Sequence, residues 1–204
     1  MGQDFIVELG TRIRIARNRV GLTQSQLAEL IDVSTNHISA LERGIYEMKI
    51  ELFAVGKTQT RHLEEGIRVY TERIGHYLPF ALTVIPDIKA TRSLSEERQK
   101  ELEGERMLSA FQPSDYVVLL DERGTQMTSR EFATFIDRRM SSGLKRLIFV
   151  IGGPYGFSDA VYARADAKLS LSKMTFSHEM IRLFFTEQIY RAMTILRGEP
   201  YHHD

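Results

Sequence analysis

The stretch Leu147–Thr175, LIFVIGGPYGFSDAVYARADAKLSLSKMT, decides the fold of this chain. It opens with the five apolar residues Leu147–Ile151, a run that is typical of a strand buried on both faces of a parallel sheet. The segment Gly152–Gly156 follows with three glycines in five residues, which indicates tight turns or a backbone that a ligand approaches closely. In open α/β sheets, ligands usually bind at the carboxyl ends of parallel strands. A plain strand-to-helix turn explains the glycines equally well, and the G-x-G-x-x-G spacing of a dinucleotide site is missing.

Outside this stretch, residues 48–204 alternate between apolar runs and amphipathic segments. This alternation predicts one α/β domain with a parallel sheet that helices cover on both faces. The expected strands are 48–55, 80–85, 115–120, 145–151 and 168–171. The expected helices are 62–77, 95–111, 128–140, 158–164 and 177–197. Residues 121–124 are expected to form a loop after the third strand.

The last expected helix, 177–197, carries apolar residues around nearly its whole circumference. Such a helix is buried on all sides. One side can pack on the sheet, and the other side needs a partner, for which a second copy of the chain is the economical choice. A central core helix in a monomer is the alternative.

Residues 1–47 form a separate helical module. Its first amphipathic helix ends at Gly21, and the pair Thr23 and Gln26 has the capping-box spacing that opens a second helix. Ser34 is a plausible N-cap of a third helix. Two short helices joined by a tight turn make a helix-turn-helix. The wording LTQSQLAELIDVSTNHISALERG resembles the DNA-binding domain of the Xre/Cro repressor family.

The charge of this module argues against DNA binding. Residues 1–47 hold five arginines and six acidic residues, whereas neutralisation of phosphates supplies most non-specific affinity for DNA. The chain also runs directly into an expected strand, where members of the Xre/Cro family usually continue with two more helices. A structural appendage is therefore favoured over productive DNA binding through residues 1–47.

The composition narrows the class of protein further. Lys+Arg and Asp+Glu each count 27 in the 204 residues, so no strong field of the whole protein attracts nucleic acid. The chain has no cysteine, which excludes disulfides, thiol catalysis and cysteine-based zinc sites, and no metal site is predicted. No apolar run reaches the length of a membrane span, and the N-terminus lacks a signal-peptide layout. A cytoplasmic protein is therefore expected.

Several motifs occur together between residues 48 and 204. Beside the glycine loop they are AVGK at 54–57, LSLSKMT at 169–175, SHEMIR at 177–182, EQIYRA at 187–192 and PYHHD at 200–204. Together they resemble the RlmH-type family of the SPOUT superfamily, whose members methylate N3 of a pseudouridine in 23S ribosomal RNA. The resemblance implies a C-terminal trefoil knot, an obligate homodimer, and S-adenosylmethionine (SAM) as the methyl donor, held in the knot loops largely by backbone groups.

The resemblance also implies roles for individual residues. The SAM site would be formed by Leu120, Gly153, Leu171, Ser172, Lys173, Met174, Thr175 and Phe176. A side chain at position 153 would then enter the cofactor cradle. The N3 imide must lose its proton, so a general base helps the reaction. His202 of the partner subunit is the candidate catalytic base, and Tyr201 is the candidate that orients the base or the RNA. A phosphate contact by His202 without a proton role is an equal alternative.

Two functions are therefore carried forward. The first is SAM-dependent methylation of 23S rRNA in the assembled ribosome, with the ribosome as partner of a homodimer. The second is a DNA-binding regulator that uses the knotted domain only for dimerisation or SAM sensing. The intact cofactor loop and tail favour the enzyme. Two recognition helices about one DNA turn, roughly 34 Å, apart in a dimer would favour the regulator.

Overall fold

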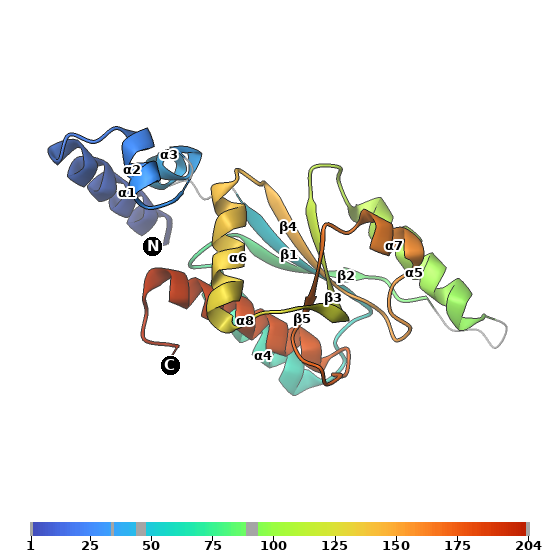
Figure 1. Ribbon diagram of the computed structural model, residues 1–204. Helices are drawn as coiled ribbons and strands as arrows, with labels where there is room; N and C mark the ends of the chain where they lie inside the picture. Colours follow the sequence, from blue (N-terminus) through green and yellow to red (C-terminus); the bar gives the residue numbers. More distant parts are fainter. Residues whose placement is uncertain (1, 34, 44–47, 89–93, 203–204) are drawn as a thin grey trace.

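The computed structural model describes residues 2–33, 35–43, 48–88 and 94–202. These residues form a small helical part at the N-terminus and an α/β part (Figure 1). The structure therefore confirms the predicted combination of a helix-turn-helix with a parallel α/β sheet. Within the described residues, no helix combines the length and the apolar character that crossing a membrane requires.

The sheet has five strands in the order β2-β1-β4-β3-β5, and each neighbouring pair is parallel. The central strand, β4, is the run that opens the stretch quoted above. Its residues Leu147–Val150 are fully buried, as expected for a parallel strand with a helix layer on each face. The strands are β1 (Lys49–Val55), β2 (Phe80–Ile85), β3 (Tyr116–Gln126), β4 (Arg146–Ile151) and β5 (Ala167–Ser170).

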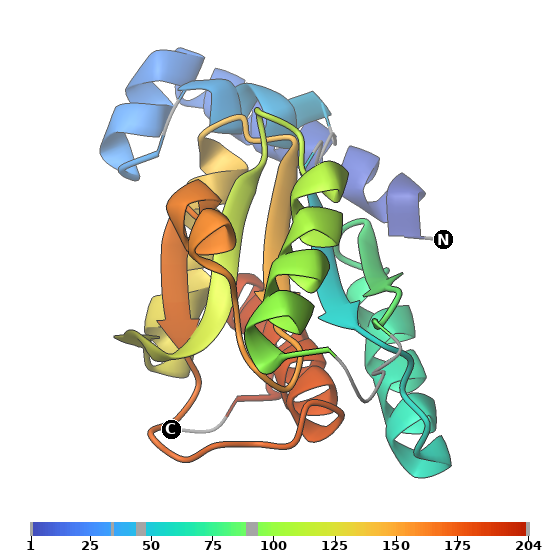
Figure 2. The ribbon, with the colours of Figure 1, turned by 90° about the vertical axis from the view of Figure 1, so that its right-hand side faces the viewer.

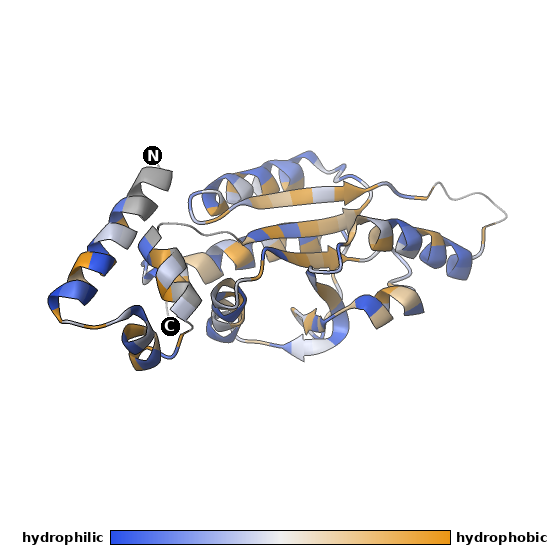
Figure 3. Cartoon of the chain, turned by 90° about the horizontal axis from the view of Figure 1, so that it is seen from above, coloured by the Kyte–Doolittle hydropathy of each residue, from blue (hydrophilic) through white to orange (hydrophobic). Residues whose placement is uncertain are grey.

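Helices cover both faces of the sheet, and each face has its own apolar core. Phe149 of β4 packs with Phe132 and Phe185 on one face, whereas Ile148 and Val150 belong to the core of the other face. Figure 3 shows the strands as mostly hydrophobic, with the hydrophilic residues gathered on the helices and loops. The first face is covered by α4 (Arg61–Ile74), α6 (Ser129–Ser141) and α8 (Met180–Arg197), and the second by α5 (Glu96–Ala110) and α7 (Asp159–Arg164).

The third strand differs from the prediction. The residues 121–124, expected to form a loop, continue β3 as far as Gln126. The extension pairs with β5 after a register shift between Leu120 and Thr125. Gly124 permits this pairing, because a Cβ atom there would lie 2.6 Å from the backbone of Leu169. The expectation of a loop was wrong. The charged residues 121–123 and Gly124 are typical of a loop, but pairing with β5 stabilises them as a strand.

Helix α8 is less uniformly buried than its composition indicated. Phe185 and Ile189 are fully buried in the core, but Phe184 and Leu196 are 44% and 38% exposed in the single chain. One polar residue of the helix, Arg182, is instead completely buried. The exposed apolar residues keep open the expectation of a second copy, which this single chain does not test.

The N-terminal part contains α1 (Gly2–Arg19), α2 (Gln24–Leu30) and α3 (Thr35–Arg43). The predicted capping box of Thr23 and Gln26 is present, and Gly21 ends the first helix with a positive φ of 71°. The buried carboxylate of Glu42 joins the three helices: it accepts hydrogen bonds from Arg17 of α1 and Gln24 of α2. The expected N-cap, Ser34, lies outside the described residues. Helix α3 contacts α6 of the α/β part.

Candidate cofactor-binding site

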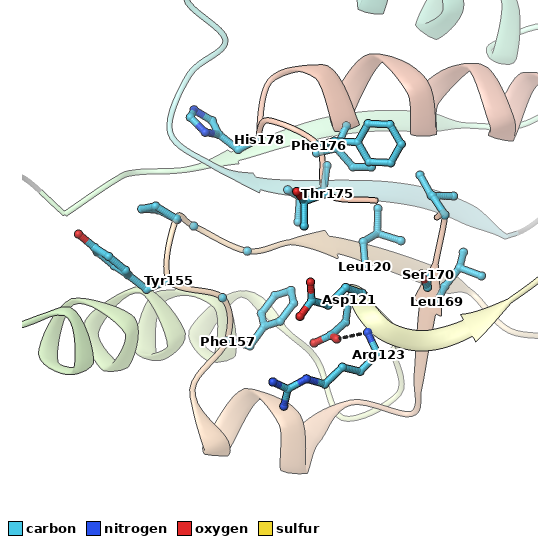
Figure 4. Close-up of a pocket in the computed structure, with 18 of the residues that line it drawn as sticks. Leu120, Asp121, Arg123, Tyr155, Phe157, Leu169, Ser170, Thr175, Phe176 and His178 are labelled. Carbon is cyan, nitrogen blue, oxygen red and sulfur yellow. Dashed lines mark hydrogen bonds between the residues drawn. The ribbon is translucent and has the colours of Figure 1, made fainter. Parts of the chain in front are cut away.

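A cavity of about 740 Å³ lies at the carboxyl ends of β3, β4 and β5. Three segments form most of its wall: the continuation of β3 at 120–123, the glycine loop at 151–157, and the segment 169–178 that runs from the end of β5 toward α8 (Figure 4). Residues of three helices complete the lining: Lys100 of α5, Asp159 and Tyr162 of α7, and Ile181 of α8. The three segments are far apart in the sequence, and parallel pairing of their strands brings them to one edge of the sheet. This is the usual place for a ligand in an open α/β sheet.

The glycine loop forms a tight turn at the cavity wall. The backbone N–H of Gly156 donates to the carbonyl of Gly153 at 3.1 Å, and Gly156 adopts a φ of +80° that favours glycine. A Cβ atom on Gly152 would lie 3.2 Å from the carbonyl oxygen of Gly156. Phe157 is buried below the turn, and Ser158 then caps α7 by accepting from the N–H of Val161. The loop is therefore fixed at both ends.

The segment after β5 crosses the carboxyl ends of the strands before it enters α8, as Figure 2 shows. Ser170 donates its hydroxyl to the carbonyl of Ser172 at 2.9 Å, and the Ser172 hydroxyl accepts from the N–H of Met174 at 2.9 Å. The rings of Phe176 and Phe184 pack together with their centroids 5.3 Å apart. Short polar side chains thus shape the segment, while its larger apolar side chains remain available at the cavity.

Seven of the eight residues predicted to bind the cofactor line this one cavity. Lys173 belongs to the same segment but is not a lining residue. The seven lining residues are Leu120, Gly153, Leu171, Ser172, Met174, Thr175 and Phe176.

The cavity also has polar walls that the sequence analysis did not single out. Asp121 accepts a hydrogen bond from the N–H of Arg123 at 2.7 Å and another from the hydroxyl of Tyr162. Burial, followed by this hydrogen bond to Asp121, raises the pKa of Tyr162 to about 12. The phenol is therefore neutral at physiological pH and acts as a fixed hydrogen-bond donor. The unexpected continuation of β3 places Asp121 and Arg123 at the cavity, and α7 supplies Tyr162.

A buried carboxylate lies directly behind the glycine loop. Glu103 of α5 is 1% exposed, and its Oε1 accepts from Nε2 of Gln99 at 2.9 Å. Its Oε2 has no hydrogen-bond partner among the residues that the structure describes. A Cβ atom on Gly153 would lie 2.2 Å from this oxygen, so the missing side chain of Gly153 makes room for the carboxylate. A side chain at position 153 would therefore meet Glu103, which corrects the expectation that it would enter the cradle.

One signal in the sequence could have drawn attention to Glu103. The next residue, Gly104, stands inside a helix, where glycine costs about 1 kcal/mol relative to alanine. Such a glycine needs a packing reason. Here a Cβ atom on Gly104 would lie 2.3 Å from Oγ of Ser158, so the glycine lets α5 approach the glycine loop and α7 closely.

Comparisons with known proteins agree with this geometry. A family model described as a predicted SPOUT methyltransferase matches residues 48–202, and a helix-turn-helix model matches residues 8–54. The chain belongs to the SPOUT methyltransferase family. It is 60% identical over 156 residues to a protein of Christiangramia forsetii named ribosomal RNA large subunit methyltransferase H, covering 76% of this chain and 99% of that one. Proteins of the same name from Parabacteroides distasonis and Bacteroides thetaiotaomicron are 59% and 56% identical, each covering 77% of this chain and 100% of the relative.

The tail of this SPOUT methyltransferase lies away from the cavity of its own chain. Neither Tyr201 nor His202 lines the cavity. They follow the carboxyl end of α8, and the chain there turns back toward the middle of that helix. The Tyr201 hydroxyl donates to Glu187 at 3.1 Å, and Nδ1 of His202 lies 3.4 Å from the guanidinium of Arg191. Burial raises the pKa of the Tyr201 phenol. The described part of the tail is thus held against α8, and its catalytic role stays a prediction.

The first turn of α8 fixes the loop after β1. The buried guanidinium of Arg182 donates to the carbonyls of Val55 and Gly56 at 2.6 and 2.8 Å. Burial lowers its pKa. Glu179 accepts from the N–H groups of Gln59 and Thr60 at 3.0 and 3.1 Å. A hydrogen bond with the Thr60 side chain, followed by that from the Gln59 N–H, lowers the pKa of Glu179 to about 2. Glu179 and Arg182 thereby hold the start of α8 against the end of β1 and the loop that follows it.

Proposed function

We propose that this SPOUT methyltransferase transfers a methyl group from SAM to N3 of a pseudouridine in 23S ribosomal RNA of the assembled ribosome. The observation that carries the proposal is the cavity that three segments separated in the sequence build at the carboxyl ends of β3, β4 and β5. The names of the relatives, which are more than 50% identical over nearly their whole length, support ribosomal RNA as the substrate. Work on ribosomes would place the protein in the cytoplasm.

The residues of the cavity fit SAM. Its volume of about 740 Å³ lies within the range of ~300–1,000 Å³ that is usual for small-molecule sites. Leu120, Leu171 and Phe176 offer apolar surface for an adenine, and the glycine loop offers backbone groups without side chains in the way. The unpartnered carboxylate oxygen of Glu103 behind the loop suits a cationic ligand. SAM brings a methyl group that its sulfonium already activates, so this chain has to supply position and electrostatics.

We propose that the segment 171–179 is part of a trefoil knot, as in the family that the chain resembles. The support is its course: the chain leaves β5 at one edge of the sheet and reaches α8, where Arg182 binds the end of β1 across β3 and β4. A test is single-molecule stretching of the chain by its two termini. A knotted chain should remain shorter than its fully extended contour, whereas an unknotted chain should reach it.

We propose that the protein acts as a homodimer in which the tail of each subunit completes the cavity of the other. Within one chain, neither Tyr201 nor His202 lines the cavity, and the apolar side chains of Phe184 and Leu196 are exposed on α8. In this arrangement His202 of the partner subunit removes the N3 proton, and Tyr201 of the partner subunit orients the base. The alternative for His202 is a contact with a phosphate of the RNA.

Complementation between two inactive variants tests the shared site. One variant carries Gly153→Val, and the other lacks residues 201–204. When the two are co-expressed, the mixed dimer has one cavity with an intact glycine loop and a full-length tail from the partner. Methyl transfer should therefore return in the mixed dimer. If each tail served its own cavity, both sites of the mixed dimer would be defective and activity would stay absent.

We propose that residues 1–47 are a separate module in front of a methyltransferase domain formed by residues 48–204, with no part in methyl transfer. The module touches the α/β part through α3 and α6, and none of its described residues lines the cavity. A variant without residues 1–47 should keep the affinity for SAM. Loss of SAM binding on this deletion would contradict the division.

Transfer of tritiated methyl groups tests the proposed reaction directly. Ribosomes from a strain that lacks this modification are the substrate, and fully modified ribosomes are the matched control. Incorporation into 23S rRNA of the unmodified ribosomes alone is expected. Incorporation into neither preparation, by a protein that binds SAM, would refute the proposed substrate.

A further inference from the structure

Among the described residues, two buried side chains each keep one polar atom without a hydrogen-bond partner: Glu103 Oε2 and Arg182 Nε. The other nitrogens of Arg182 are used by the loop after β1. Glu103 is different, because its unpartnered oxygen faces Gly153, and Gly153 is part of the cavity wall. A buried carboxylate oxygen that lacks a partner is costly to a protein. Its position therefore calls for a functional explanation.

From this arrangement we propose that Glu103 is a specificity-determining residue that selects the positively charged methyl donor over its neutral product. The inference rests on the proposed use of SAM. SAM carries a sulfonium cation, whereas S-adenosylhomocysteine, the product left after methyl transfer, has a neutral thioether at the same place. A fixed negative charge behind the glycine loop stabilises the first ligand and not the second, because only the first has a charge there.

The packing of α5 fixes the carboxylate in this position. Gln99, one turn earlier on the helix, donates to Oε1, so the group cannot turn away without losing that hydrogen bond. Gly104 lets the helix lie close to Ser158, at the end of the glycine loop. The carboxylate is shielded from water, so its field is less screened than that of a surface acid.

Gly153 lies between the carboxylate and the cavity, and its lack of a side chain lets the carboxylate approach closely. Any larger residue at 153 would occupy the space in which Oε2 lies. The combination of a glycine and a buried acid thus brings a negative charge close to the ligand without offering an oxygen that could be methylated. A selective site of this kind favours release of the product after each turnover.

Calorimetric titration of the full-length protein tests the proposal with three ligands. The ligands are SAM, S-adenosylhomocysteine, and sinefungin, whose amine carries a positive charge in place of the sulfonium. The variant Glu103→Gln keeps the shape of the side chain and removes its charge. Its affinity for SAM and for sinefungin should fall on the order of tenfold, and its affinity for S-adenosylhomocysteine should stay within about twofold. The matched control is Glu105→Gln, an exposed acid of the same helix, which should change none of the three affinities.

A second variant, Glu103→Asp, guards against a folding defect. It keeps the charge and should retain most of the preference for the cationic ligands. Equal losses for all three ligands in Glu103→Gln would mean that Glu103 only holds the loop in place, and unchanged affinities would mean that it does not act on the ligand; either result overturns the inference. Failure of the unmodified protein to bind SAM would instead refute the proposed function itself.

Discussion

The contact between Gly153 and Glu103 gives a prediction whose size can be worked out from the structure. In Gly153→Ala the new methyl group would lie 2.2 Å from Oε2, 2.9 Å from Cδ and 3.2 Å from Oε1 of Glu103. The carboxylate must then move by roughly 1 Å to restore normal contact distances. Such overpacking costs about 1–3 kcal/mol. Loss of the hydrogen bond from Gln99 would bring the total toward the upper end of that range.

Urea denaturation at fixed protein concentration measures this cost. The free energy of unfolding of Gly153→Ala should fall by about 2–3 kcal/mol, as a lower midpoint with an unchanged slope. The same substitution in a Glu103→Ala background should cost less than about 0.5 kcal/mol, because the opposing group has been removed. An equal cost in both backgrounds would refute the reasoning, since the methyl group would then be strained against something other than the carboxylate.

Three further predictions concern other parts of the chain. Arg182→Leu should lower the free energy of unfolding by about 2–5 kcal/mol in urea, because the buried carbonyls of Val55 and Gly56 lose their donor; a change below about 1 kcal/mol would contradict this. Hydrogen bonds from Arg17 lower the pKa of Glu42 from its usual 4.5, so their stabilisation is complete above that pH and is lost as pH falls through the lower folded-state pKa. Glu42→Gln should lack this loss of stability below about pH 4.5 in denaturation curves, and matching pH profiles would exclude the ion pair as its cause. Deletion of residues 201–204 should leave SAM affinity by calorimetry unchanged and remove methyl transfer, and full activity would exclude His202 as the base.

Much of the fold follows from local patterns in the sequence. The buried run Leu147–Ile151 forms the central strand, and the capping boxes at Thr23 and Thr128 begin helices where their spacing places them. These elements were predictable because residues a few positions apart stabilise them. The extension of β3 was not, because a glycine among charged residues usually marks a loop. Its stability comes from the backbone of Leu169, which is distant in the sequence.

The candidate site likewise contains parts that the sequence predicts and parts that it does not. The glycine loop and the segment 169–175 could be found from motifs, because their residues are contiguous. Glu103 belongs to no motif, and it stands on a helix in which most side chains are charged, where acids are usually solvated. Its only sequence signal is the neighbouring Gly104 inside the helix. Arg182 is similar: in the sequence it interrupts an apolar helix, and only the fold supplies the two carbonyls that bind it.

The opposite ends of the sheet carry different parts of this protein. The helices before residue 44 lie at the amino ends of the strands, and the cavity lies at the carboxyl ends (Figure 1). Material attached in front of β1 therefore extends away from the catalytic edge. A fluorescent tag or a surface tether fused at the N-terminus should therefore leave the entrance of the cavity unobstructed.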